Sequence, residues 1–148
     1  MIEEVVVSRE NIRLKAEAKD WKEAIKISGN ILKDNEYVKE QYVEDMVDAV
    51  EKLGPYIVIM PHVAIAHARP GEDVLKDGLS LATFKKPIEF GNEDNDPVDL
   101  VFSLCAKSNQ NHLKVLEYLA KVLEDEKKVY ILRSSGNIDE VYNILNNN

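Results

Sequence analysis

The feature that most constrains the fold of this chain is an apolar run at residues 98–106, VDLVFSLCA. Branched and aromatic side chains suit a pleated strand, and an apolar run without strict alternation is typical of a strand buried on both faces. Such a strand needs side chains of other elements packed against each of its faces. The run therefore predicts the middle of a sheet that is covered by a layer of structure on either side.

The remaining periodicities supply both the sheet and its covering layers. Strand-like stretches lie at residues 11–16, 56–60, 63–66 and 79–84, and helical spacing appears in two segments after the first strand and three at the end. This order predicts an α/β fold, namely a three-layer α/β/α sandwich with a mixed β-sheet flanked by helices. With 148 residues, the chain has the length of a single domain spanning residues 1–148.

Capping residues and spacing set the expected helix boundaries and buried faces. Asp20 followed by Glu23 resembles a capping box, and Asn137 followed by Glu140 repeats that spacing before the last helix. A second helix is expected at residues 38–53, where a Gly-Pro pair ends it. The side chains predicted to face the core include Leu53 in that helix, Leu113, Leu116, Ala120 and Leu123 in a helix beginning near Asn111, and Ile138, Val141, Tyr142 and Leu145 in the last helix.

Composition restricts the classes of partner and compartment. The formal net charge is −8, which argues against nonspecific binding of nucleic acid, since that requires clustered cations. The first residues lack the features of a secretory signal, and no run approaches the ~20 apolar residues of a membrane span. Cys105 is the single cysteine, so core packing is its expected role rather than a disulfide or a thiolate zinc cluster. A cytoplasmic location is expected.

Residues 59–71, IMPHVAIAHARPG, hold two of the three histidines and the main candidate for chemistry. The apolar residues before His67 predict a buried strand, and Pro70 and Gly71 predict a turn. His67 is therefore expected where a rigid strand gives way to a loop, which is a common support for a reactive side chain. A neutral imidazole beside the guanidinium of Arg69 suits attack on a phosphoryl group, because the guanidinium can hold an anion. A structural histidine is the alternative interpretation.

His112 is the second candidate, because it opens a helix after the polar residues 108–111. Helix N-termini present N–H groups and a partial positive charge that attract phosphate. A histidine there could therefore donate a hydrogen bond to a phosphoryl group. An exposed histidine without a function is the alternative, and the residues alone favour it.

Metal binding is a minor alternative. His62 and His67 lie five positions apart, so a straight strand directs their side chains to opposite faces. The acidic segment at residues 93–97 lacks the glycine and the distal glutamate of a calcium loop. Asp96 or Asn95 is instead expected to fix the backbone of a turn there.

Five segments occur in an ordered and fairly specific combination: EKLGPY (51–56), AIAHARP (64–70), KPIEF (86–90), DNDPV (94–98) and HL (112–113). Together they resemble the enzyme IIA domain of the mannitol/fructose class (type 2) of the bacterial sugar phosphotransferase system (PTS), closest to its ascorbate-type branch. The resemblance runs from about Asn11 to Leu145. It places the family's phosphorylated histidine on His67 and its second active-site histidine on His112.

The chain departs from the family pattern near the reactive histidine. Ala66 stands where the family usually has proline, and His62 stands where it usually has glycine. The mannitol branch also places an arginine near the end of the preceding helix, where this chain has DAV at residues 48–50, which leaves Arg69 as the nearer candidate for charge neutralisation. Because Ala66 lacks the fixed φ of proline, the loop is expected to be held less rigidly.

The resemblance implies a phosphotransferase component with a phosphohistidine intermediate. His67 would accept a phosphoryl group from the histidine phosphocarrier protein and pass it to a sugar-specific IIB component, which in turn serves a membrane IIC component. Ascorbate-like carbohydrate uptake is the expected process, with no cofactor, metal or nucleic acid, and a homodimer remains open. The alternative is a regulatory IIA-like module that controls a partner protein through its phosphorylation state.

Overall fold

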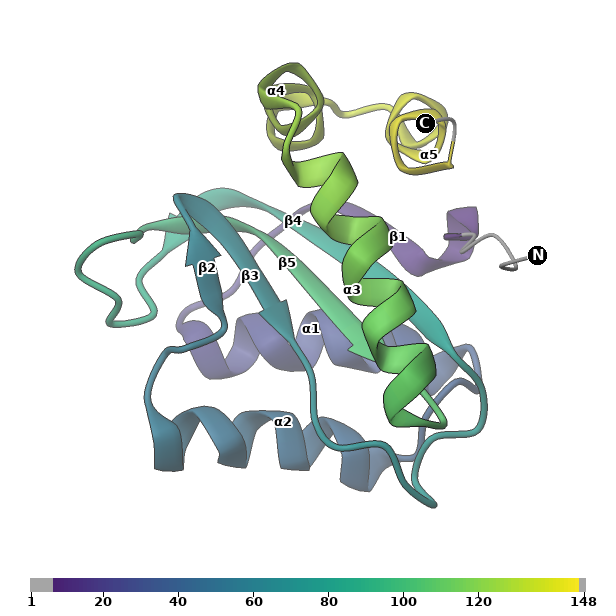
Figure 1. Cartoon of the computed structure of the whole chain (residues 1–148). Coiled ribbons are helices and arrows are strands. Elements are labelled where there is room, and N and C mark those ends of the chain that lie inside the picture. Colours follow the sequence, from purple (N-terminus) through teal and green to yellow (C-terminus); the bar gives the residue numbers. More distant parts are fainter. Residues whose placement is uncertain (1–6, 147–148) are drawn as a thin grey trace.

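A five-stranded mixed sheet forms the middle layer of the protein, which a computed structural model describes over residues 7–146 (Figure 1). The strands are β1 (Ile12–Ala16), β2 (Val58–Met60), β3 (His62–Ala66), β4 (Gly78–Ile88) and β5 (Val98–Cys105). Their order across the sheet is β1-β4-β5-β3-β2. The β1–β4 and β3–β5 pairs are parallel, whereas the β4–β5 and β2–β3 pairs are antiparallel. The predicted mixed sheet is thus confirmed.

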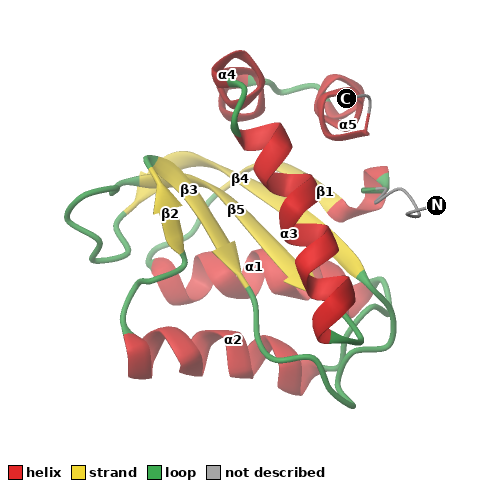
Figure 2. Cartoon of the chain, in the orientation of Figure 1, coloured by secondary structure: helices red, strands yellow, loops and turns green. Residues whose placement is uncertain are grey.

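Helices cover both faces of this sheet. They are α1 (Trp21–Asp34), α2 (Glu40–Leu53), α3 (Asn109–Leu123), α4 (Glu126–Ser134) and α5 (Ile138–Asn146), and a short 3-10 helix at Arg9–Asn11 precedes β1. Figure 2 shows α1 and α2 together on one side of the sheet and α3, α4 and α5 on the other, which confirms the three-layer architecture. Within residues 7–146, no helix is both long and apolar enough to cross a membrane.

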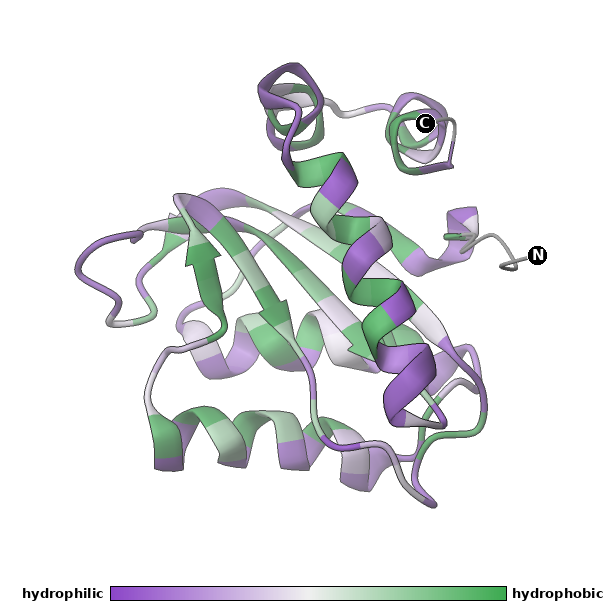
Figure 3. Ribbon diagram, in the orientation of Figure 1, coloured by the Kyte–Doolittle hydropathy of each residue, from purple (hydrophilic) through white to green (hydrophobic). Residues whose placement is uncertain are grey.

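Strand β5 belongs to both hydrophobic cores, as its apolar run predicts. All of its residues are buried. Leu100, Phe102 and Leu104 pack with α3, α4 and α5, while Val101 and Cys105 pack with α1 and α2. A fully buried leucine or phenylalanine contributes ~1.5–3 kcal/mol relative to an exposed one, so β5 anchors both layers to the sheet. Figure 3 shows the same division, with hydrophobic colour along the inner strands and polar bands on the outer sides of the helices.

The capping residues lie where the sequence predicts them. The Asp20 carboxylate accepts from the Glu23 N–H at 2.9 Å, and the Glu23 carboxylate accepts from the Lys19 N–H at 3.1 Å. The side-chain oxygen of Asn137 accepts from the Glu140 N–H at 3.2 Å, as its spacing suggests. At the other end of α2, Gly54 adopts a φ of 86°, a conformation that costs glycine little and ends the helix.

Some of the predicted inward side chains point outward. Leu53 is 72% exposed and Leu113 is 59% exposed, and Ala120 is also exposed. Helix α3 carries two neighbouring apolar stripes, and the sheet covers the stripe that contains Val115 and Leu119 rather than the one that starts at Leu113. Leu53 ends its helix beyond the edge of the core. Leu123, Val141 and Leu145 are buried as predicted, whereas Ile138 is 39% exposed.

The acidic turn before β5 is held by Asp96, as expected. Its carboxylate accepts from the backbone N–H groups of Phe90 at 3.0 Å, Gly91 at 2.8 Å and Asn92 at 3.1 Å. A carboxylate that accepts several N–H groups fixes a turn firmly, because each bond is charge-assisted. This turn therefore delivers the chain into β5 with a defined geometry.

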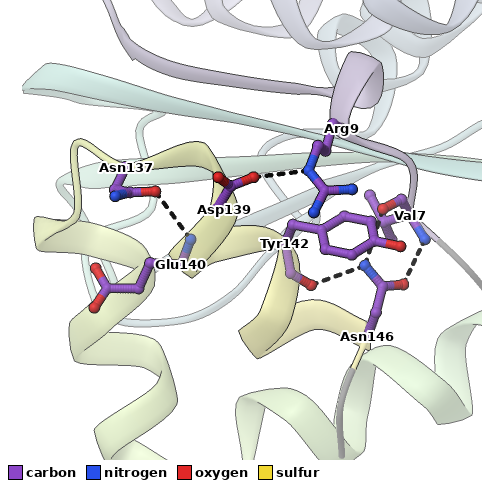
Figure 4. Close-up of polar contacts among 7 residues, drawn as sticks. All are labelled: Val7, Arg9, Asn137, Asp139, Glu140, Tyr142 and Asn146. Atoms are coloured by element: carbon purple, nitrogen blue, oxygen red, sulfur yellow. Dashed lines mark hydrogen bonds and ion pairs between the residues drawn. The ribbon is translucent and has the colours of Figure 1, made fainter.

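The segment before β1 is tied to the last helix (Figure 4). The backbone N–H and carbonyl groups of Val7 both bond the Asn146 side chain, at 2.8 and 2.9 Å. Arg9 bonds Asp139 at 2.8 Å, and its guanidinium lies 4.0 Å from the centre of the Tyr142 ring. These contacts close the layer formed by α3, α4 and α5 against the edge of the sheet.

Candidate functional site

His67 lies at the exit of β3, the position that the sequence predicts. The strand ends at Ala66, and the His67 side chain is half-buried. Its Nδ1 lies 3.0 Å from the carbonyl oxygen of Ile65. A carbonyl oxygen can only accept a hydrogen bond, so the neutral ring carries its proton on Nδ1. The other nitrogen, Nε2, therefore keeps its lone pair and is the nucleophilic atom of the ring.

Two aromatic rings flank the imidazole of His67. The ring of His112 lies 5.4 Å away, centre to centre, with an interplanar angle of 71°, and the ring of Tyr56 lies 5.9 Å away at 87°. Edge-to-face contacts at such distances are favourable and restrict ring rotation. The structure therefore brings together the two histidines that the sequence singles out. His67 follows the end of β3 in the sheet, and His112 lies in the first turn of α3, in the helical layer on one face of that sheet.

The histidines open into a cavity of about 500 Å³. The wall is formed by the end of α2, the loop that follows β3 and the start of α3. Its lining residues are Asp45, Ala49, Leu53, Tyr56, His67, Ala68, Arg69, Pro70, Asn109 and His112. The cavity thus has room for a small anion beside Nε2 of His67, and the first turn of α3 contributes a partial positive charge to it.

His112 is neutral in this setting. Burial, together with the neighbouring His67, lowers the pKa of His112 below its ordinary value of 6.5. Its Nδ1 is buried and has no hydrogen-bond partner within residues 7–146. A neutral imidazole has one donor and one acceptor nitrogen. His112 can therefore donate a hydrogen bond to an anion in the cavity.

Arg69 lies at the mouth of the cavity with an exposed side chain. In the part of the chain that the structure describes, no carboxylate forms an ion pair with it. Its guanidinium is thus available to an anion bound at His67, although solvent screens a charge in this position. Asp45, on the opposite element, accepts a hydrogen bond from Gln41 at 2.9 Å and places one negative charge on the wall.

Sequence reasoning did not identify Tyr56 or Leu53 as members of the site. The sequence pattern predicts Tyr56 in a strand and Leu53 in the core, but β2 starts only at Val58 and both side chains line the cavity. The signal was the Gly54-Pro55 pair, which places the flanking residues in a turn on the surface. His62, at the other end of β3, does not line the cavity. Among residues 7–146, no cluster of three or more His, Cys, Asp or Glu side chains could hold a metal ion.

Comparisons with known proteins identify the family of the chain. The family model described as "Phosphoenolpyruvate-dependent sugar phosphotransferase system, EIIA 2" matches residues 5–148. An ascorbate-specific PTS system EIIA component of Salmonella choleraesuis is 41% identical over 136 residues, which cover 91% of this chain and 88% of that protein.

Solved structures share the fold as well. The chain superposes on the complex of enzyme IIAMTL and phosphorylated enzyme IIBMTL from Escherichia coli with a TM-score of 0.86 and 30% identity, covering 96% of this chain and 98% of that chain. The nitrogen regulatory protein IIA-Ntr of Neisseria meningitidis gives a TM-score of 0.80 and 25% identity, covering 95% and 96% of the two chains. The chain therefore belongs to the EIIA 2 family of the phosphoenolpyruvate-dependent sugar phosphotransferase system.

Proposed function

We propose that this protein carries a phosphoryl group on Nε2 of His67 during carbohydrate uptake. The group is taken from the phosphohistidine of the histidine phosphocarrier protein, so one P–N bond breaks as another forms. It is then passed to a sugar-specific IIB component, which serves a membrane IIC component. The whole chain, residues 1–148, acts as one cytoplasmic domain in this scheme.

The observation that carries the proposal is the orientation of His67. The Ile65 carbonyl occupies Nδ1, which leaves Nε2 as the atom able to attack phosphorus. Phosphoryl transfer depends mainly on positioning and on stabilising charge at the equatorial oxygens. His112 supplies a hydrogen-bond donor for this charge, the start of α3 supplies the partial positive charge of its helix dipole, and Arg69 supplies a screened positive charge at the mouth.

The surroundings of the cavity suit protein partners. Leu53, Tyr56 and Leu113 are 72%, 43% and 59% exposed, and they come from α2, the loop after it and α3. Large exposed apolar side chains around a reactive group are typical of a docking surface. The histidine phosphocarrier protein and the IIB component would have to use this surface in turn, because both must reach the same Nε2.

Ascorbate-like carbohydrate uptake is the process that the relatives favour. The proteins at about 40% identity are named ascorbate-specific components, whereas the mannitol-type structures are about 30% identical. Residues 48–50 lack the arginine that the mannitol branch places near the end of this helix, which weakens an assignment to mannitol and leaves Arg69 as the nearer cation. The substrate itself would be selected by the membrane component.

The decisive experiment is stepwise phosphorylation. The protein is incubated with phosphoenolpyruvate, enzyme I and the histidine phosphocarrier protein, and the phosphorylated residue is located by mass spectrometry. We expect one acid-labile, base-stable phosphate on His67, and its transfer to an ascorbate-type IIB component when that protein is added. Absence of any label would contradict the proposal.

The same experiment distinguishes the transport role from a regulatory role. The regulatory role is the alternative function, and the likeness to the nitrogen regulatory protein supports it. A regulatory module would also accept the phosphate on His67. It would then retain the phosphate in the presence of IIB components and change its affinity for another partner instead.

A further inference from the structure

Tyr42 places a buried hydroxyl group directly behind the reactive loop. The residue lies on α2 and is 1% exposed. Its hydroxyl donates to the Leu104 carbonyl at 2.7 Å and accepts from the Ala68 N–H at 3.0 Å. The Ala68 carbonyl lies 3.2 Å from the same oxygen, but a hydroxyl has one proton, and the shorter contact identifies Leu104 as the acceptor.

These bonds begin where the sheet pairing ends. The last paired residues of β3 and β5 are Ala66 and Ser103. Beyond them the chain of β3 leaves the sheet while β5 continues to Cys105. The hydroxyl of Tyr42 therefore joins Ala68 to Leu104 after direct backbone pairing has stopped, and the bridge comes from a different layer of the fold.

His67 is consequently held from both sides. On one side, its ring is hydrogen-bonded to the carbonyl of Ile65, two residues earlier in β3. On the other side, the N–H of the next residue, Ala68, donates to the Tyr42 hydroxyl. The sequence predicts a loosely held loop because Ala66 lacks the fixed φ of proline. The bridge through Tyr42 restrains the same loop by hydrogen bonds.

We propose that Tyr42 is a positioning residue for phosphoryl transfer, whose hydroxyl fixes the backbone at His67 so that Nε2 faces the cavity beside His112. The inference rests on the proposed role of His67. Burial raises the pKa of Tyr42 far above its ordinary value, so the hydroxyl keeps its proton and the bridge does not depend on pH near neutrality.

The test compares Tyr42→Phe with a matched control, Val43→Ala. Phenylalanine keeps the ring and removes only the bridge. Val43 is 3% exposed on the same helix, packs against Gly29 of α1, and has no polar group that could hydrogen-bond the reactive loop. We expect both variants to melt at lower temperature than the parent protein.

The two variants should differ in transfer. Small displacements of a reacting atom cost up to about 100-fold in rate, so in Tyr42→Phe we expect kcat for phosphoryl acceptance to fall roughly 10- to 100-fold. KM for the phosphocarrier should stay unchanged, because Tyr42 lies beneath the docking surface. In Val43→Ala, kcat should equal that of the parent. The ¹⁵N signals of the His67 ring should shift or broaden in Tyr42→Phe alone.

Wild-type kcat in a folded Tyr42→Phe protein would overturn the inference, as would equal losses of kcat in both variants. If Tyr42→Phe fails to fold, replacing the Ala68 amide by an ester removes the same N–H donor, and this protein must show the same loss of kcat. Failure of the parent protein to be labelled on His67 would instead contradict the proposed function, which separates the two outcomes.

Discussion

The two ends of β3 each carry a histidine, and the two rings have different surroundings. At the entrance, His62 adopts a φ of 76°, and its N–H bonds the Asn95 carbonyl at 3.3 Å. Its Nδ1 is buried without a hydrogen-bond partner among residues 7–146. At the exit, the Nδ1 of His67 is bonded to a carbonyl and its ring faces His112 and the cavity. Both histidines adjoin the same apolar strand. What makes His67 the candidate nucleophile is the carbonyl bonded to its Nδ1, together with the position of its ring beside His112 and the cavity.

The largest effect is expected from His67→Ala, because this change removes the proposed nucleophile. Acid-labile phosphorylation by the phosphocarrier should be lost completely, while circular dichroism should show an intact fold. Mass spectrometry of the purified variant provides the measurement. Full labelling of the variant would contradict the assignment of His67 as the phosphorylated residue. A label found on His62 would assign that role to the histidine at the entrance of β3.

His112→Ala is expected to slow phosphoryl transfer by about 100-fold, since one hydrogen-bond donor to the transition state is worth roughly 100- to 1000-fold in related cases. The variant should still become labelled on His67 when incubated long enough. His112→Gln keeps a donor and should fall between the two, as measured by rapid-quench kinetics. A phosphate on residue 112 of the parent protein, or an unchanged rate in His112→Ala, would remove this residue from the mechanism.

Arg69→Ala should have a smaller effect, because the side chain is exposed and exposed charge pairs are worth ~0.2–1 kcal/mol. We expect transfer to slow by roughly 1.4- to 5-fold at low salt, which corresponds to that energy. Raising the salt concentration should narrow the difference from the parent protein, and Arg69→Lys should recover most of the rate. A loss that does not depend on salt would show that Arg69 reaches a desolvated position on the phosphoryl group.

The smallest effect on transfer is expected for His62→Gly. Glycine tolerates the positive φ at this position, and relief of that strain is worth about 1 kcal/mol. The free energy of unfolding, measured by denaturant titration, should therefore stay the same or rise slightly, with an unchanged rate of labelling at His67. Slower transfer in His62→Gly would mean that the backbone conformation at the entrance of β3 affects the reactivity of His67 at its exit.

Much of this architecture follows from local patterns, while the site depends on packing that such patterns do not encode. The apolar run of β5 predicts a doubly covered strand, and the capping residues Asp20 and Asn137 predict where α1 and α5 begin. Helix α3 shows the limit, since two apolar stripes at equivalent spacing fit the same sequence and only the sheet selects between them. Neither the approach of His112 to His67 nor the reach of the Tyr42 hydroxyl has a signature in sequence spacing, because each joins segments far apart in the chain.

The hydrogen bond between His67 and Ile65 also determines which chemical isomer the protein would store. Phosphohistidine exists as two regioisomers, one modified on each ring nitrogen, and they differ in hydrolytic lifetime and in antigenicity. With Nδ1 engaged by a carbonyl, phosphorylation on Nε2 yields only the 3-phosphohistidine isomer. Antibodies selective for that isomer should therefore recognise the loaded protein, and those raised against 1-phosphohistidine should not.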